Sequence, residues 1–156
     1  MYKIRFDSEG DLWTASADKT AKHLVRQRDW AADTVLPHPD FVRDVVVAEN
    51  IGMVVTACRD EEVRLWDISS GDLLCVYSGH FEEVTGLVLV GKSVVSVSID
   101  ASVRRWSLER GDIARYLQEK REEEQGQQSA EGSGPSNSGM QLTAEEEAEL
   151  AELMDE

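Results

Sequence analysis

Histidine, serine or cysteine, and aspartate, the residue types of a hydrolytic triad, recur at related positions along this sequence. The two sets are His80, Ser98 and Asp100 in the later stretch and His38, Cys58 and Asp60 in the earlier one. In a triad the histidine takes the proton of the serine or cysteine nucleophile, and the carboxylate orients the imidazole. A hydrolase is therefore the first hypothesis that these residues raise, and it requires a hydroxyl or thiol that is free to react.

The elements that position these residues also repeat. Three stretches superimpose on Asp18, Asp60 and Asp100, which are 42 and 40 residues apart. A tryptophan lies six residues after the second and third aspartates, at Trp66 and Trp106. A period of about 40 residues is typical of the four-stranded blades of a β-propeller.

Short runs of β-branched residues between turn residues predict the strands of each unit. In the first unit these runs are residues 2–6, 11–16, 22–26 and 32–36. In the middle unit they are residues 45–47, 52–58, 62–68 and 73–78. In the last unit they are residues 83–90, 93–99, 102–108 and 112–117, the final run being also compatible with a helix. We therefore expect an all-β fold of about three four-stranded blades, over residues 1–36, 37–78 and 79–117.

These motifs resemble the WD-repeat β-propeller family over about residues 1–117, through Gly79-His80, Trp66-Asp67 and the repeated spacing of histidine, serine, aspartate and tryptophan. The residues that match the structural tetrad of the family are His80, Ser98, Asp100 and Trp106 in the last unit, His38, Cys58, Asp60 and Trp66 in the middle unit, and Ser16 and Asp18 in the first. The first unit departs from the pattern, because Leu24 stands where the tryptophan is expected.

The resemblance implies that the tetrads are structural. In the family the aspartate orients the imidazole, which bonds a hydroxyl that also receives the tryptophan N–H, so that the buried network satisfies itself. A hydroxyl used in this way is not available as a nucleophile. The sequence also has no Gly-rich phosphate loop, Cys-x-x-Cys or His-Glu-x-x-His motif. We therefore expect no catalytic, cofactor-binding or metal-binding residues, with Cys58 a buried structural thiol and His23 a surface or lumen residue.

The charge is concentrated at the C-terminal end. The formal net charge is −15, and residues 119–156 hold 12 of the 31 acidic residues but only two of the 16 basic ones. This balance argues against nucleic acid or an anionic membrane as the main ligand. The sequence also lacks an apolar run of about 18 residues that could span a bilayer.

The composition predicts two segments after the blades. Residues 119–139 read as a flexible linker, acidic at first and then rich in Gly and Ser, because such a segment buries too little apolar surface to offset its ordering entropy. Residues 140–156 read as an acidic tail with a short helix, in which Thr143 and Glu146 form a capping box. The tail is either a solvated acidic segment or a short motif whose apolar residues, Leu150, Leu153 and Met154, fit the groove of a partner.

The resemblance also implies that loops on one rim of the blades bind protein segments. The candidate contact residues there are Phe41, Phe81, Arg59 and Arg104. Phe41 and Phe81 stand at equivalent places in successive units, and each either contacts a partner or covers the edge of its own blade.

A non-enzymatic scaffold or adaptor for protein–protein interactions fits these features, with a protein partner that the sequence does not identify. The alternative is an acidic-tail chaperone or escort for basic proteins such as histones or ribosomal proteins. Three blades leave the outer sheet faces unprotected, so we expect a longer propeller, completed by the rest of a longer gene product or by another chain. Two isolated cysteines favour a cytoplasmic or nuclear location.

Overall fold

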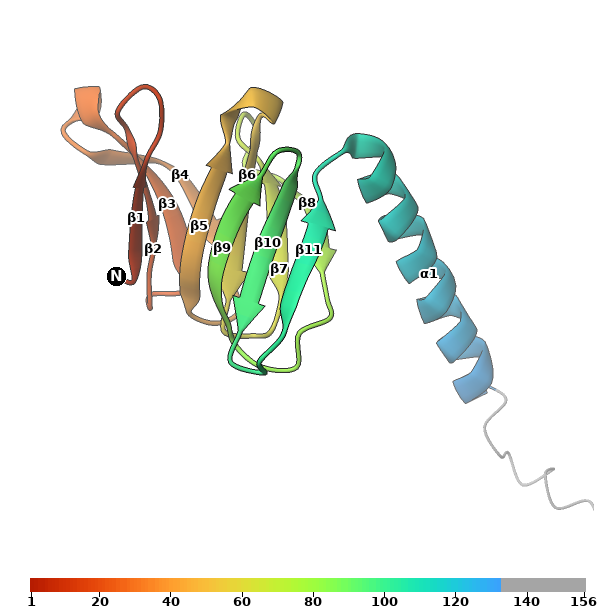
Figure 1. The fold of residues 1–156 in the computed structure, drawn as a ribbon. Coiled ribbons are helices and arrows are strands. Elements are labelled where there is room, and N and C mark those ends of the chain that lie inside the picture. Colours follow the sequence, from red (N-terminus) through yellow and green to blue (C-terminus); the bar gives the residue numbers. More distant parts are fainter. Residues whose placement is uncertain (133–156) are drawn as a thin grey trace, which may run out of the picture. The chain divides into compact units, whose positions relative to one another are not determined.

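Three antiparallel sheets follow one another in chain order in the computed structural model, which describes residues 1–132 (Figure 1). The first sheet has the order β1 (Lys3–Phe6), β2 (Leu12–Ala15), β3 (Thr20–Val25) and β4 (Ala31–Pro37). The second has the order β5 (Val42–Ala48), β6 (Met53–Cys58), β7 (Val63–Asp67) and β8 (Leu73–Tyr77). The third contains β9 (Val84–Val90), β10 (Ser93–Ser98) and β11 (Val103–Ser107). These sheets, called the first, middle and last blades below, confirm the expected all-β blade architecture.

The strands form where the β-branched runs predict them, and the turns between them repeat. In each blade the turn from the second to the third strand places one residue at positive φ directly after the repeated aspartate. These residues are Lys19, Glu61 and Ala101, with φ of 67°, 74° and 64°. Each of the three aspartates accepts a hydrogen bond from the backbone N–H two residues further on, which closes the turn as an Asx-turn does.

Neighbouring blades pack face to face. The core between the first and middle blades contains Trp13, Ala15, Ala21 and Leu36 from the first, with Val42, Val45, Val54 and Trp66 from the middle blade. On the other side of the middle blade, β9 packs against β5 and β6. The buried carboxylate of Asp44 joins the two, because it accepts a 2.9 Å hydrogen bond from the backbone N–H of Leu87. The middle blade is therefore covered on both faces, and every residue of β6 is buried.

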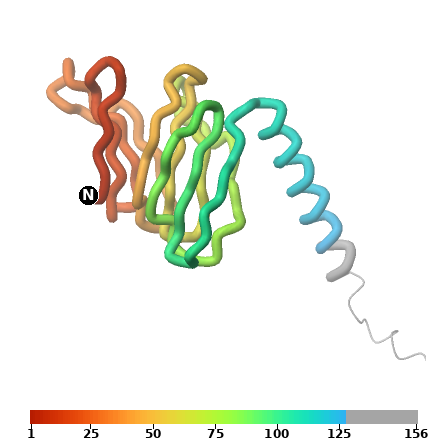
Figure 2. The backbone as a smooth tube through the Cα atoms, viewed as in Figure 1, coloured from red at the N-terminus to blue at the C-terminus, as the bar shows by residue number. Residues whose placement is uncertain are grey.

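The outer faces of the first and last blades remain exposed. In the first blade Ile4, Phe6 and Val35 lie on the face turned away from the middle blade, and Phe6 is 70% exposed. In the last blade the outer face carries Val88, Val90, Val97 and Val103, and Val103 is 68% exposed. Figure 2 shows the two outer sheets on either side of the middle one. In repeat proteins an apolar face of this kind is normally buried against the next repeat.

The chain after β11 differs from the prediction. A helix, α1 (Arg110–Gly132), occupies residues 112–117, for which either a fourth strand or a helix was expected, and the first part of the predicted linker at 119–139. The segment is rich in Glu, Gln, Lys, Arg and Ala, which favour helices even without an apolar face. Asp112 in the first turn accepts a 2.7 Å hydrogen bond from the Ser107 hydroxyl. The last blade therefore has three strands within residues 1–132, and the remainder of the predicted linker and the tail at 140–156 lie outside the described residues.

The structure divides the chain into two compact units, Met1–Tyr116 and Leu117–Glu156. The blades and the first residues of α1 belong to the first unit. Among the described residues, no helix has both the length and the apolar composition needed to cross a membrane.

Candidate functional site

The last blade contains a hydrogen-bonded chain from tryptophan to aspartate. Trp106 Nε1 donates to Ser96 Oγ at 2.8 Å, and Ser96 Oγ lies 2.6 Å from His80 Nε2. Because an indole N–H can only donate, Ser96 Oγ accepts from Trp106, and the same oxygen bonds the histidine ring nitrogen. His80 Nδ1 lies 2.9 Å from Ser102 Oγ and 3.4 Å from Asp100 Oδ2. Ser102 and the Phe81 backbone N–H bond this carboxylate and hold the pKa of Asp100 far below its usual value.

The serine of this chain is Ser96, which corrects the prediction of Ser98. Ser96 and Ser98 lie two residues apart on β10, so side-chain alternation places both on the same sheet face. The register separates them, because Val94 pairs with Trp106 and Ser96 with Arg104, whereas Ser98 lies beyond the last β10–β11 pair. Ser98 Oγ instead donates to the carbonyl of Glu82 at 3.0 Å and accepts from the Asp100 N–H at 3.2 Å. Ser98 is a turn residue.

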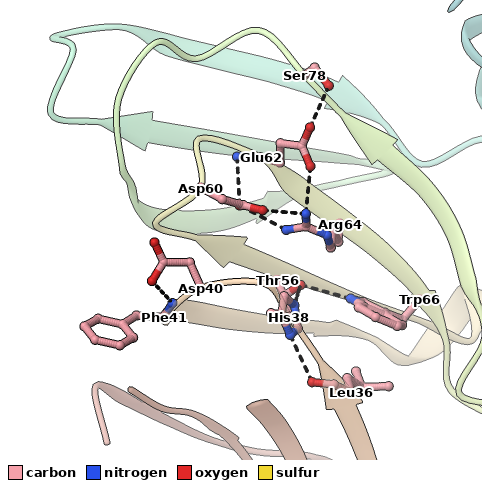
Figure 3. Close-up of polar contacts among 10 residues, drawn as sticks. All are labelled: Leu36, His38, Asp40, Phe41, Thr56, Asp60, Glu62, Arg64, Trp66 and Ser78. Atoms are coloured by element: carbon pink, nitrogen blue, oxygen red, sulfur yellow. Dashed lines mark hydrogen bonds and ion pairs between the residues drawn. The ribbon is translucent and has the colours of Figure 1, made fainter. Parts of the chain in front are cut away.

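The middle blade repeats the chain with a threonine (Figure 3). Trp66 Nε1 donates to Thr56 Oγ1 at 3.0 Å, Thr56 Oγ1 lies 2.7 Å from His38 Nε2, and His38 Nδ1 bonds the Leu36 carbonyl at 2.9 Å. The hydroxyl again comes four residues before the aspartate, so Thr56 replaces the predicted Cys58. Burial lowers the pKa of His38 to about 4, and the imidazole is therefore neutral at pH 7.

Cys58 is a buried free thiol, as predicted. Burial raises its pKa to about 11, so the sulfur is protonated at neutral pH. A thiol in this state is a poor nucleophile. The histidine that would activate it in a catalytic pair, His38, already bonds Thr56.

Asp60 of the middle blade pairs with an arginine rather than with histidine. Arg64 Nη2 lies 2.5 Å from Asp60 Oδ2 and 2.7 Å from Glu62 Oε2, so that it bridges the two carboxylates (Figure 3). Burial alone raises the pKa of Asp60, but the hydrogen bonds and charge of Arg64 outweigh it, and the pKa is lowered. Glu62 also accepts from the Ser78 hydroxyl at 3.3 Å, which ties the turn to the segment after β8.

The first blade keeps the turn but not the tetrad. Ser16 Oγ accepts the Asp18 N–H at 3.3 Å, and Asp18 Oδ2 pairs with Lys22 at 3.0 Å. Hydrogen bonds from Thr20 lead the effects that lower the pKa of Asp18 to about 2. The hydroxyl position four residues before the aspartate is the buried Thr14, but Leu24 stands in the tryptophan position. Thr14, Thr56 and Ser96 share this spacing, a signal in the sequence that would have identified the hydroxyls.

The predicted rim residues are in two different situations. The Phe81 side chain is 75% exposed, although its backbone N–H is bonded to Asp100 at 2.8 Å. Phe41 is half-buried, with its ring centroid 6.5 Å from that of Tyr2 and 5.3 Å from the Arg59 guanidinium. Phe41 therefore packs between residues of the first and middle blades, whereas Phe81 is presented to solvent.

Arg104 is half-buried on β11 and occupies the position equivalent to Arg64. Its Nε has no hydrogen-bond partner among the residues that the structure describes, in contrast to the paired guanidinium of Arg64. Leu150, Leu153 and Met154 of the predicted tail motif lie outside the described residues.

Comparison with known proteins connects the blades to a family of repeats. An uncharacterized WD repeat-containing protein of Schizosaccharomyces pombe is 37% identical over 158 residues, which cover all of this chain and 39% of that protein. Periodic tryptophan protein 2 of Arabidopsis thaliana is 27% identical over 67% of this chain and 12% of its own length. A scan against protein-family models gives no match.

Solved structures agree in fold. The WD40 β-propeller domain of Doa1 superimposes with a TM-score of 0.62 and 31% identity, covering 70% of this chain and 38% of that one. The computationally designed Ika4 protein gives a TM-score of 0.61 at 25% identity, covering 68% of this chain and 64% of its own. This chain thus spans about two fifths of the S. pombe relative.

Proposed function

Because the chain belongs to the WD-repeat β-propeller family, we propose that it is a non-enzymatic scaffold that binds a protein segment on the rim around Phe81. The rim consists of the loops before β5 and β9 and the turns β6–β7 and β10–β11. The observation that carries the proposal is the 75% exposure of Phe81 beside an ordered turn, since its backbone N–H is fixed to Asp100. An exposed aromatic side chain on a rigid backbone is typical of an interface anchor.

The polar chemistry of the blades supports a structural role. Ser96 and Thr56 are fully buried, and each hydroxyl is bonded to both histidine and tryptophan. Ser98 bonds the Glu82 carbonyl, whereas the ring nitrogens of His80 bond Ser96 and Ser102, so the triad that the hydrolase hypothesis requires is not formed by His80, Ser98 and Asp100. WD-repeat propellers are generally non-enzymatic, in keeping with these contacts.

The exposed outer faces support a second part of the proposal, that further blades complete the propeller. Phe6 and Val103, on the two outer faces, are each about two-thirds exposed or more. The edge of β11 has no fourth strand within residues 1–132. We propose that blades from a longer protein or from another chain cover both faces and that an added strand pairs with β11. Arg104 lies on β11 itself, and its Nε can donate a hydrogen bond to an acidic side chain of the added strand.

Affinity purification with quantitative mass spectrometry tests the rim. The full chain is compared with Phe81→Ala combined with Arg59→Ala, and with Trp30→Ala as the matched control. Trp30 is also an exposed aromatic, 40% exposed, but it belongs to the β3–β4 connection of the opposite rim. The proposal expects a specific partner to be lost from the double variant and kept by Trp30→Ala, with circular dichroism unchanged. Equal capture by all three proteins would contradict a binding site on this rim.

A further inference from the structure

A histidine and two aspartates converge in the first blade, away from the Phe81 rim. Asp7 and Asp11 belong to the β1–β2 turn, and His23 lies on β3. One ligand atom from each residue lies within 4.8 Å of the other two. His23 Nε2 is 3.2 Å from Asp7 Oδ2 and 3.8 Å from Asp11 Oδ2. The three side chains are only 16%, 12% and 10% exposed, so the group is largely removed from solvent.

Backbone contacts hold the two carboxylates in this orientation. Asp7 Oδ1 accepts from the N–H groups of Glu9 and Asp11 at 3.1 and 2.9 Å. Asp11 Oδ1 accepts from the Arg26 N–H at 2.8 Å. Each carboxylate thus uses one oxygen to fix the local backbone and directs the other at the same histidine nitrogen. That nitrogen carries at most one proton, which can serve only one of the two carboxylates.

The imidazole is also held from its other side. The ring of His23 stacks on Trp13 with centroids 4.7 Å apart and planes at 25°. Its second nitrogen, Nδ1, faces Asp33 Oδ2 at 3.9 Å. At 3.9 Å this is an ion-pair distance rather than a hydrogen bond, and it places a third carboxylate on the far side of the ring.

The spacing fits a small divalent cation. Ligand atoms about 2.0–2.1 Å from a tetrahedral Zn²⁺ are about 3.3 Å apart. The 3.2 Å from His23 to Asp7 matches this separation, whereas the 3.8 Å to Asp11 requires that carboxylate to move inward, and all three ligand atoms lie within 4.8 Å. Asp7 and His23 also line a surface hollow of about 470 Å³, into which Glu49 and Asp67 contribute negative charge and Arg110 positive charge. This hollow leaves room for water in a fourth position.

We propose that Asp7, Asp11 and His23 form a zinc-binding site that ties the β1–β2 turn to β3. The site stabilises the blade that lacks the tryptophan of the tetrad, where Leu24 stands instead. His23, expected from the sequence as a surface or lumen residue, is then a ligand. The three residues are spread over 17 positions with no recognisable metal-binding motif, and the sheet register alone brings them together.

Zinc titration of the untagged, chelator-treated full chain tests the site. Calorimetry is expected to give one site per chain, with release of protons on binding. Zinc is expected to raise the melting temperature, and addition of EDTA is expected to reverse this shift. Asp11→Asn keeps an oxygen for the Arg26 N–H and should weaken zinc binding at least tenfold, as should His23→Gln. Asp18→Asn is the control, because Asp18 is an aspartate of the same blade that lies in the β2–β3 turn and outside the cluster, and this variant should bind as the parent chain does.

Cobalt(II) provides a readout that does not depend on the variants folding. Bound to the unmodified chain, cobalt is expected to show the strong visible absorption of a four-coordinate site and to be displaced by zinc. Absence of saturable binding overturns the proposal. So does unchanged affinity in both Asp11→Asn and His23→Gln, since zinc would then bind elsewhere, for example at the acidic C-terminal residues.

Discussion

The middle and last blades share a tetrad framework, yet their aspartates make different contacts. In the last blade Asp100 remains with His80 at 3.4 Å, and Ser102 bonds both residues. In the middle blade Asp60 is held by Arg64. The residue two positions after the aspartate explains the difference. Ser102 offers a hydroxyl to histidine, whereas Glu62 adds a second carboxylate that draws the arginine in.

This difference changes the electrostatic surroundings of the buried histidine. With Asp60 engaged by Arg64, His38 has only a carbonyl and a hydroxyl as partners. Neither compensates for burial of a charged ring, so the neutral form is favoured and the pKa falls.

The largest expected effect is an acid sensitivity of the middle blade. Unfolded, His38 takes up a proton below its ordinary pKa of 6.5, whereas in the folded chain it does so only near pH 4. The unfolded state therefore binds more protons than the folded state between pH 6.5 and 4, and the free energy of unfolding falls as the pH is lowered through this range. The expected loss is about 2 kcal/mol between pH 7.5 and 5. Urea unfolding at the two pH values measures this, and His38→Gln should remove most of the dependence. An equal loss in the variant would assign the effect to other groups.

The second prediction compares the contributions of two hydroxyls of the last blade to stability, the buried one of Ser96 and the turn one of Ser98. Ser96→Ala leaves the Trp106 N–H and His80 Nε2 without their shared partner and should destabilise the chain by about 1–2 kcal/mol. Ser98→Ala is the matched control, with an expected loss of less than about 0.5 kcal/mol because its bonds lie at the exposed turn. Denaturant unfolding decides between them, and the reverse order would restore Ser98 to the tetrad.

The sequence predicted the blade architecture because period and strand pattern are local features. Asp18, Asp60 and Asp100 located the turns, and Trp66 and Trp106 located the third strands. The choice of hydroxyl was wrong because alternation places residues two apart on the same sheet face, so that only their spacing from the aspartate or the strand register distinguishes them.

The continuation of α1 beyond residue 117 and the cluster around His23 were missed for different physical reasons. A polar segment without apolar periodicity carries no pattern that predicts a helix, and the helix there depends on the intrinsic propensity of residues such as Glu, Gln and Lys. The contact of Asp7 and Asp11 with His23 depends on the pairing of β1, β2 and β3. Residues that meet only through pairing leave no spacing signal in the chain.

Hydrogen exchange of the three second strands tests the central claim most directly, that only the middle blade is packed on both faces. β2, β6 and β10 are interior strands with hydrogen-bonded neighbours on both sides, so they differ mainly in how their sheet faces are covered. In dilute protein, the amides of β6 are expected to exchange most slowly, with those of β2 and β10 at least tenfold faster. Equal protection of all three strands would contradict the account, because the outer faces would then not weaken the blades that carry them.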